Sequence, residues 1–195
     1  GFASECYYIP EGVETIGNGA FHTCILIEEI VLPSSLRTIQ SQAFWSLQNM
    51  KAIHLNEGLQ SIADNCFVYS NKLETITIPS TVTNIAYGAF TEMSGLKEAI
   101  VLGGISTLNR YTFENDTALE RVYLPASLTS IGSGVFGNCT ALTDICYAGS
   151  EEDWANVTIN TASYAGSRPV VIDTCNIHYN VPIEAYQSLT FENDN

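Results

Sequence analysis

The sequence predicts an α/β-type repeat solenoid, a right-handed coil of about six repeats with one short parallel sheet and a C-terminal cap. Three observations predict this fold: a phenylalanine every 23 residues, apolar residues at fixed offsets from it, and a proline after several of the expected strands. We place the solenoid at residues 1–147, the cap at 148–182 and a tail at 183–195.

The repeat is defined by a column of phenylalanines with one spacing. Its members are Phe21, Phe44, Phe67, Phe90, Phe113 and Phe136. A period of about 20 to 29 residues, with a local pattern such as Leu-x-x-Ile-x-Ile at 73–78, is typical of leucine-rich repeats. A single coil cannot bury its own apolar face, so we expect the coils to stack and these rings to form the structural core.

Each coil is expected to contribute one strand. Ile76-Thr77-Ile78 alternates with period two and is β-branched, which places Ile76 and Ile78 inward and Thr77 outward. Proline lacks the backbone N–H that a ladder needs, so the chain must turn after these strands. The prolines at this position are Pro10, Pro33, Pro79 and Pro125.

The fifth coil departs from this pattern. Leu102-Gly103-Gly104-Ile105 replaces the proline turn, and Ala99 is small for its inward position. We therefore expect a local distortion there. Beyond the last coil, Ser150 and Asp153 suit a capping box that begins a short helix and lays Trp154 over the open end of the core.

The string Leu-Pro-Ser-Ser-Leu-x-x-Ile-x-x-x-Ala-Phe at 32–44, echoed at 78–90 and 124–136, resembles the BspA-like leucine-rich-repeat family. The resemblance covers about residues 7–147. Segments 147–154 and 176–180 are similar to the closing element that follows such repeats in gut and oral bacteria. The resemblance implies a secreted or cell-surface protein, and some relatives of this kind bind host extracellular proteins or other cells.

Composition excludes several classes of partner. The net charge is −14, from 7 Lys and Arg against 21 Asp and Glu, so a nucleic acid or an anionic membrane surface is a poor partner. The apolar stretches are too short for membrane insertion. No charged segment followed by an apolar one opens the chain, which starts with Gly1, so we expect a processed or trimmed N-terminus.

No catalytic or metal-binding motif is present. The three histidines, His22, His54 and His178, form no His-Glu-x-x-His pattern, and the sequence has no Gly-x-Ser-x-Gly elbow or phosphate-binding glycine loop. The acidic residues are scattered over positions that solvent explains. We therefore expect no enzyme activity, no catalytic residue, no metal and no cofactor.

The cysteines divide by position in the repeat. Cys24, Cys66 and Cys139 are simplest as small core residues. Cys146 and Cys175 are different, because the strand near Cys175 is expected to pair with the strand that carries Cys146. A disulfide between these two residues is a candidate, and a free-thiol count of six would exclude it.

The tenth residue after each phenylalanine is expected to face outward from the sheet. Binding candidates in this column are Tyr8, Val31, His54, Thr77, Ile100 and Tyr123, and Cys146 ends it. Aromatic residues are favoured at interfaces, and Tyr123, Ile100 and Tyr8 are the preferred contacts. The alternative is that these side chains merely suit a strand and support one another.

Trp45 and Tyr69 form a second candidate patch on another side of the coils, although Trp45 could instead fold onto the core. Three functions stay open. The first is an extracellular adhesion module that presents its sheet to a host or cell-surface protein. The second is a glycan-binding or cell-envelope module in which Trp45 and tyrosines stack on sugar rings. The third is a structural spacer within a larger surface protein.

Overall fold

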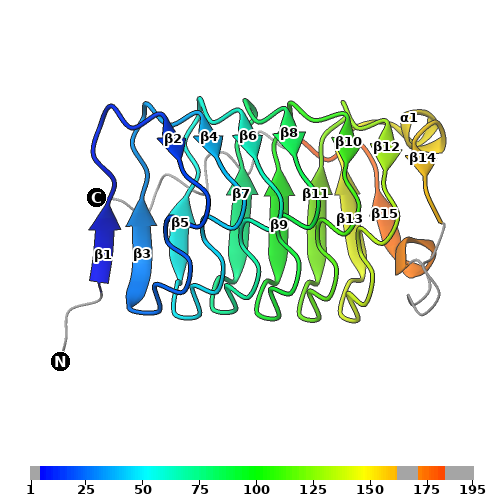
Figure 1. Ribbon diagram of the computed structural model, residues 1–195. Helices are drawn as coiled ribbons and strands as arrows, with labels where there is room; N and C mark the ends of the chain where they lie inside the picture. Colours follow the sequence, from blue (N-terminus) through cyan, green and yellow to red (C-terminus); the bar gives the residue numbers. More distant parts are fainter. Residues whose placement is uncertain (1–4, 162–170, 183–195) are drawn as a thin grey trace.

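The chain forms a rod of stacked coils in a computed structural model that describes residues 5–161 and 171–182 (Figure 1). One strand of each coil lies in what we call the front sheet. These strands are β1 (Glu5–Tyr8), β3 (Ile27–Val31), β5 (Ala52–His54), β7 (Thr75–Ile78), β9 (Glu98–Val101), β11 (Arg121–Leu124) and β13 (Asp144–Tyr147). Strands that pair within the front sheet run parallel, and this confirms the expected repeat solenoid.

A second, shorter strand in each coil forms the rear sheet. Its members are β2 (Thr15–Ile16), β4 (Thr38–Ile39), β6 (Ser61–Ile62), β8 (Asn84–Ile85), β10 (Thr107–Leu108) and β12 (Ser130–Ile131). The second residue of each is buried. Each coil was expected to contribute one strand, so the rear sheet was not predicted. In the described residues, the only α-helix belongs to the cap and not to a coil.

The phenylalanine column is confirmed as the centre of the core. Neighbouring ring centroids from Phe21 to Phe136 lie between 5.1 and 5.9 Å apart. Phe44, Phe67, Phe90 and Phe113 are fully buried, and Phe136 is nearly so. Phe21 is only half-buried; in the described part of the chain, the ring that meets it on the side away from Phe44 is Tyr7, in a T-shaped contact at 5.3 Å.

The backbone turns on both sides of each phenylalanine through left-handed residues. The positions two before the ring are Gly19, Gln42, Asn65, Gly88, Tyr111 and Gly134; those two after it are Thr23, Ser46, Tyr69, Glu92, Asn115 and Asn138. This geometry lets alternate amides donate to the next coil, as Gly19, Phe21 and Thr23 do to Ser41, Ala43 and Trp45. Glycine and asparagine favour this conformation, so their recurrence was the available sequence signal.

The distortion expected in the fifth coil coincides with a break in the rear sheet. That sheet divides into β2-β4-β6-β8 and β10-β12-β14, with no pairing between β8 and β10. At this step the side chain of Asn109 donates to the Ile85 carbonyl at 2.6 Å. In the preceding coil the backbone amide of Ala86 makes the corresponding bond to Ile62. The front sheet also divides, between β5 and β7.

Substitution of Gly104 by alanine should destabilise the protein by about 1–3 kcal/mol, the usual cost of overpacking. Gly104 has φ +79°, and a Cβ there would collide with the carbonyl oxygens of Val82 and Ser80. Gly12 occupies the same place in the first coil with φ +92°, but nothing lies within 4 Å of its added Cβ. Gly12→Ala is thus the matched control, and equal shifts in urea midpoint for both variants would contradict the prediction.

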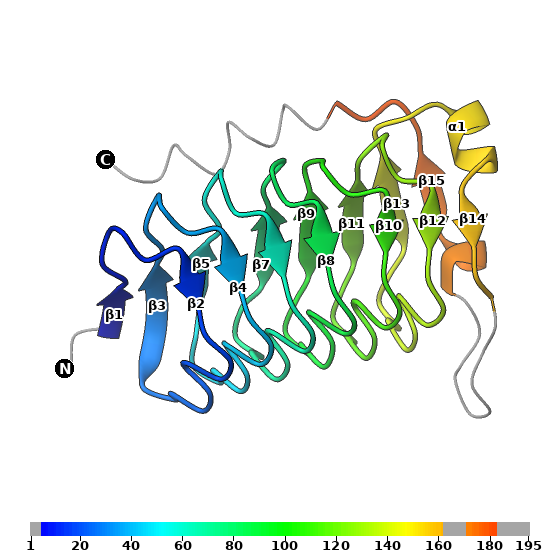
Figure 2. The ribbon, with the colours of Figure 1, turned by 45° about the horizontal axis from the view of Figure 1, so that its top comes forward.

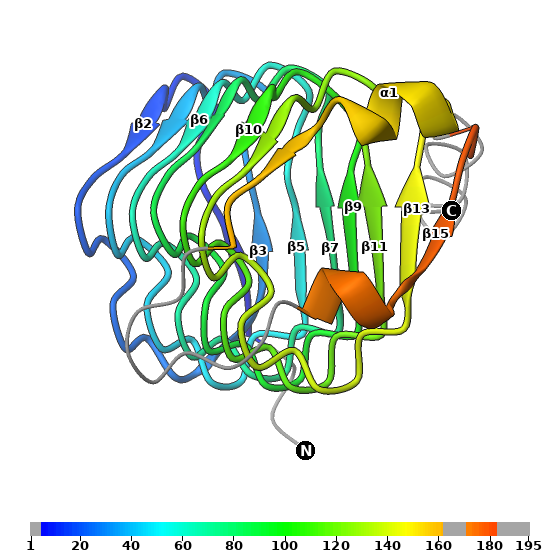
Figure 3. The same ribbon diagram turned by 90° about the vertical axis from the view of Figure 1, so that its right-hand side faces the viewer.

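The cap continues both sheets by one strand. β14 (Thr158–Ile159) pairs with β12, and β15 (Asn176–His178) pairs with β13. The helix α1 (Glu151–Ala155) begins at Ser150 with the predicted capping box to Asp153, and a 3-10 helix, η1 (Val171–Thr174), precedes β15. Figure 3, a view along the stack, shows α1 and η1 at the closed end.

Trp154 of α1 packs edge-on against Tyr147, with ring centroids 5.1 Å apart, so it lies on the core as expected. The proposed tail at 183–195 lies outside the described residues. The cap and tail boundaries are therefore predictions still.

Candidate binding surface

The outward column of the front sheet has the register that the repeat predicts. Parallel pairing aligns Tyr8 with Val31 and Val31 with His54. A second run aligns Thr77, Ile100, Tyr123, Cys146 and His178 in turn. The column therefore brings together every candidate of the sheet face, in two stretches that meet where the front sheet divides.

Exposure along this column changes from one end to the other. Tyr8 is 69% exposed, and His54 is exposed as well, while Val31 and Thr77 are half-buried. In contrast, Ile100 is 4% exposed and Tyr123 is 3% exposed. The expectation that Ile100 and Tyr123 offer open contact surface is therefore wrong for the chain as it stands.

The cause of this burial is a small apolar cluster on the outer side of the sheet. Ile100, Tyr123 and Cys146 pack together there, with Leu102 and Val181 against them. Val181 reaches the cluster because the chain turns at Asn180, whose φ is +56°. The amides of Asn180 and Val181 then donate to the carbonyls of Gly149 and Tyr147 at 2.9 and 3.1 Å. Figure 2 shows β15 beside β13, where this turn begins.

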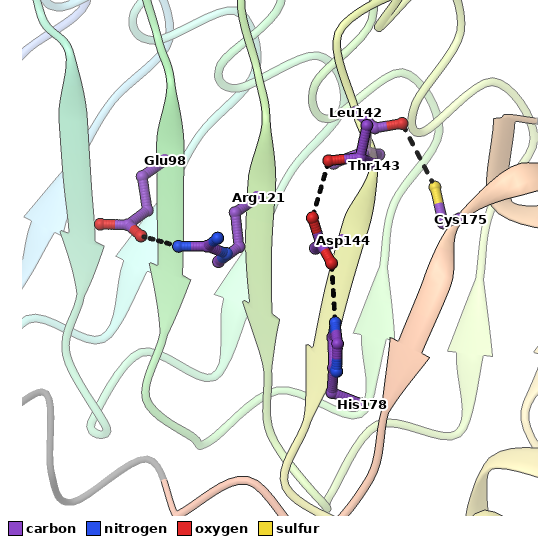
Figure 4. Close-up of polar contacts among 7 residues, drawn as sticks. All are labelled: Glu98, Arg121, Leu142, Thr143, Asp144, Cys175 and His178. Atoms are coloured by element: carbon purple, nitrogen blue, oxygen red, sulfur yellow. Dashed lines mark hydrogen bonds and ion pairs between the residues drawn. The ribbon is translucent and has the colours of Figure 1, made fainter.

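Charged side chains run beside the covered part of the column (Figure 4). Nη1 of Arg121 lies 3.8 Å from Oε1 of Glu98, and Nε2 of His178 lies 2.7 Å from Oδ1 of Asp144. The hydroxyl of Thr143 donates to the other Asp144 oxygen. The hydrogen bonds from His178 and Thr143 hold the pKa of Asp144 below its usual value. We call these four residues, 98, 121, 144 and 178, the polar row.

The candidate disulfide between Cys146 and Cys175 does not form in this structure. Both residues are free cysteines, and their side chains lie on opposite sides of the front sheet. Cys146 belongs to the outer cluster, where burial raises the pKa of its thiol. Cys175 packs against the main core and directs its Sγ to the Leu142 carbonyl at 3.6 Å. The two strands pair as expected, but the register aligns Cys146 with His178, three residues beyond Cys175.

The second candidate patch is an aromatic row across three coils. His22 stacks on Trp45 at 5.9 Å with an interplanar angle of 7°, and Tyr69 meets Trp45 edge-on at 5.7 Å. Trp45 is half-buried and Tyr69 is 41% exposed. The structure thus brings Trp45 and Tyr69 together and adds His22, which sequence analysis did not place in this patch.

Large exposed apolar side chains gather at the N-terminal end of the rod. Those of the described residues are Tyr7, Tyr8, Ile25, Leu26, Tyr69 and Tyr87, and all but the last belong to the first three coils. Exposed apolar surface that collects in one region marks contact sites more often than scattered residues do. The open part of the outward column lies in the same region.

One buried acidic residue was not singled out from the sequence. Asp116 is fully buried; its Oδ1 accepts the Met93 amide at 2.7 Å, and its Oδ2 has no hydrogen-bond partner among the described residues. Burial, with a smaller contribution from the charge of Glu92, raises its pKa well above the usual value. It stands three residues after Phe113, a place where Leu47 and Met93 pack in other coils.

Residues 5–161 and 171–182 hold no group of three His, Cys, Asp or Glu side chains arranged for a metal ion. In the same part of the chain, no helix has the length and apolar character required to cross a bilayer.

The repeats match a known protein family. A family model described as "BspA type Leucine rich repeat region" matches residues 14–143 in six copies. No protein of curated function matches the chain.

Three solved structures share the fold. The T. pallidum leucine-rich-repeat protein TpLRR has a TM-score of 0.65 at 21% identity, over 70% of this chain and 77% of that one. The pneumococcal vaccine antigen PcpA has a TM-score of 0.70 at 16% sequence identity, over 91% of this chain and 42% of PcpA. A leucine-rich-repeat protein of Eubacterium ventriosum ATCC 27560 has a TM-score of 0.50 at 17% sequence identity, over 93% of this chain and 44% of that protein. At these identities the likeness concerns the fold alone, and the chain spans less than half of the last two proteins.

Proposed function

Because this chain belongs to the BspA-type leucine-rich-repeat family, we propose that it is a non-catalytic, secreted or cell-surface module that binds a host or cell-surface protein. The family is one of surface proteins, and its repeats build a rigid face suited to protein contacts. The observation that carries the proposal is the open outward column of the first coils. Tyr8, 69% exposed, stands in it beside Val31 and His54.

The charge of the protein favours a cationic partner. Of the residues that the structure describes, Lys51 and Lys97 are already paired with Glu28 and Glu74 at 2.9 and 2.8 Å. Arg121 faces Glu98, so these cations compensate acidic neighbours instead of forming a basic patch. With a net charge of −14, the surface attracts basic partners and repels acidic ones.

Substituting Tyr8 by alanine should weaken binding to the partner by about tenfold or more, the usual effect of removing an aromatic anchor. His54→Ala should have a smaller effect in the same direction. The partner is first isolated on the immobilised wild-type protein from host extracellular material, and the purified complex is then measured by calorimetry. Tyr87→Ala is the matched control, since Tyr87 is 48% exposed and lies outside the front sheet. If Tyr8→Ala and His54→Ala both bind the partner with wild-type affinity, the open part of the front sheet is not the binding surface.

A glycan-binding or cell-envelope role is the second candidate. It is favoured by the aromatic row of His22, Trp45 and Tyr69, because aromatic side chains can stack on sugar rings. Trp45, however, is flanked by His22 on one side and by Tyr69 on the other, which leaves little open ring face. A glycan array that binds the wild-type protein and loses binding with Trp45→Ala would favour this role. A spacer role predicts that neither assay finds a partner.

A further inference from the structure

Residues 180–182, which we call the strap, follow Tyr179, whose side chain packs on the main core, and place Val181 on the outward side of the front sheet. The strap leaves β15 at the left-handed Asn180 and places Val181 on the cluster of Ile100, Tyr123 and Cys146. This cluster belongs to the same outward column as Tyr8, Val31 and His54. The chain therefore covers one half of the column with its own C-terminal segment and leaves the other half open.

We propose that the strap is a displaceable occupant of the binding face. When it leaves, Ile100, Tyr123 and Cys146 accept an extended segment of a partner protein that carries a branched aliphatic side chain in the place of Val181. The proposal rests on the proposed function, because it extends the docking surface from the first coils along the same column. It also specifies the partner segment at this position, which is extended and carries a branched aliphatic side chain.

The contacts of the strap favour release without unfolding of the cap. Within the described part of the chain, its backbone donates two hydrogen bonds, from Asn180 and Val181, and Asn180 and Pro182 are exposed. The preceding strand β15 is held better, because it pairs with β13 over three residues and Ile177 packs on the main core. Segments with few buried apolar contacts open locally at a low free-energy cost. Opening at Asn180 would uncover the cluster and leave β15 in place.

The chemistry of the covered cluster selects its occupant. Ile100, Tyr123 and Cys146 are buried and offer mainly apolar surface, so a charged group in the place of the half-buried Val181 would lose part of its hydration. The polar row beside the cluster is already paired within itself, Glu98 with Arg121 and Asp144 with His178 (Figure 4). An aliphatic side chain on an extended backbone, as the strap itself presents, therefore fits this position.

The first test measures how fast iodoacetamide alkylates Cys146 and Cys139, by peptide mass mapping at pH 8 without denaturant. Burial raises the pKa of both thiols, but Cys146 lies under the strap, whereas Cys139 lies in the core. Cys146 should react faster than Cys139 in the wild-type protein. Val181→Asp should accelerate Cys146 by about tenfold or more and leave Cys139 unchanged. Val181→Thr should act more weakly, and Val181→Ile should match the wild type.

The second test asks whether the uncovered cluster accepts a segment in trans. The probe is a synthetic peptide with the sequence of residues 176–182, Asn-Ile-His-Tyr-Asn-Val-Pro, added to the Val181→Asp protein. It should slow the alkylation of Cys146, and a peptide with aspartate in place of valine should not. Equal rates for Cys146 and Cys139 in all variants, or no protection by the first peptide, would overturn the proposal. Neither measurement involves Tyr8 or His54, so the proposed function fails or stands separately.

Discussion

Replacing Phe90 by alanine is expected to lower the free energy of unfolding by about 3–5 kcal/mol, the cost of emptying a buried aromatic site. Phe90 is fully buried between Phe67 and Phe113, with ring centroids 5.1 and 5.6 Å away. Each coil depends on its neighbours for stability, so a cavity in a central coil weakens two interfaces at once. Urea denaturation followed by far-ultraviolet circular dichroism measures the loss.

Phe21→Ala provides the matched control for this prediction. Phe21 has the same place in its coil, but it is half-buried and stacks on a ring of the column only at Phe44. We expect a loss of roughly 1–2 kcal/mol, because less apolar surface is removed from contact. An unfolding midpoint that Phe90→Ala leaves unchanged, or shifts no more than Phe21→Ala does, would contradict a continuous internal column.

Asp116→Asn is expected to make the protein more stable than the wild type at pH 8, because burial raises the pKa of the Asp116 carboxyl in the folded state, whereas asparagine does not ionise in either state. The wild-type carboxyl is fully buried, and one of its oxygens has no hydrogen-bond partner among the described residues. Asparagine keeps an acceptor for the Met93 amide, which now bonds Oδ1 at 2.7 Å. It also removes the ionisable group, so burial no longer opposes a charge.

The sign of the pH dependence follows from the raised pKa of Asp116 in the folded state. Below about pH 4 the carboxyl is protonated in both the folded and the unfolded chain. Above that pH the unfolded chain releases the proton while the folded protein retains it, so this residue makes stability fall as pH rises. The advantage of Asp116→Asn should therefore be largest at pH 8 and vanish near pH 4.

Urea midpoints measured between pH 4 and pH 8 check this dependence. Asp173→Asn makes the same chemical change at an exposed position and should follow the wild-type curve. If the curves of the wild type and Asp116→Asn run parallel, the buried carboxyl does not couple folding to pH in this range.

Periodicity could predict the parts of the candidate site that repeat. The interval between phenylalanines gives the order of the coils, and it aligns Tyr8 with Val31 and Tyr123 with Cys146. The alternation at Thr77 gives the outward direction. The sequence predicted part of the aromatic row, because the same interval places Trp45 one coil from Tyr69. Only the structure shows that His22 also belongs to this row.

The sequence by itself determined the coil, its apolar column, the strands before the prolines and the helix that begins after the capping residue Ser150. It could do so because a repeat makes each residue contact its equivalent in the next coil, so spacing along the chain becomes position in space. The tertiary structure alone decided which half of the outward column is open. That depends on Val181 and Asn180, which lie outside the repeat, and on a turn that brings them back to Tyr123 and Cys146. The same reason separates Cys146 from Cys175: register across a cap is set by the path of the chain, which periodicity does not describe.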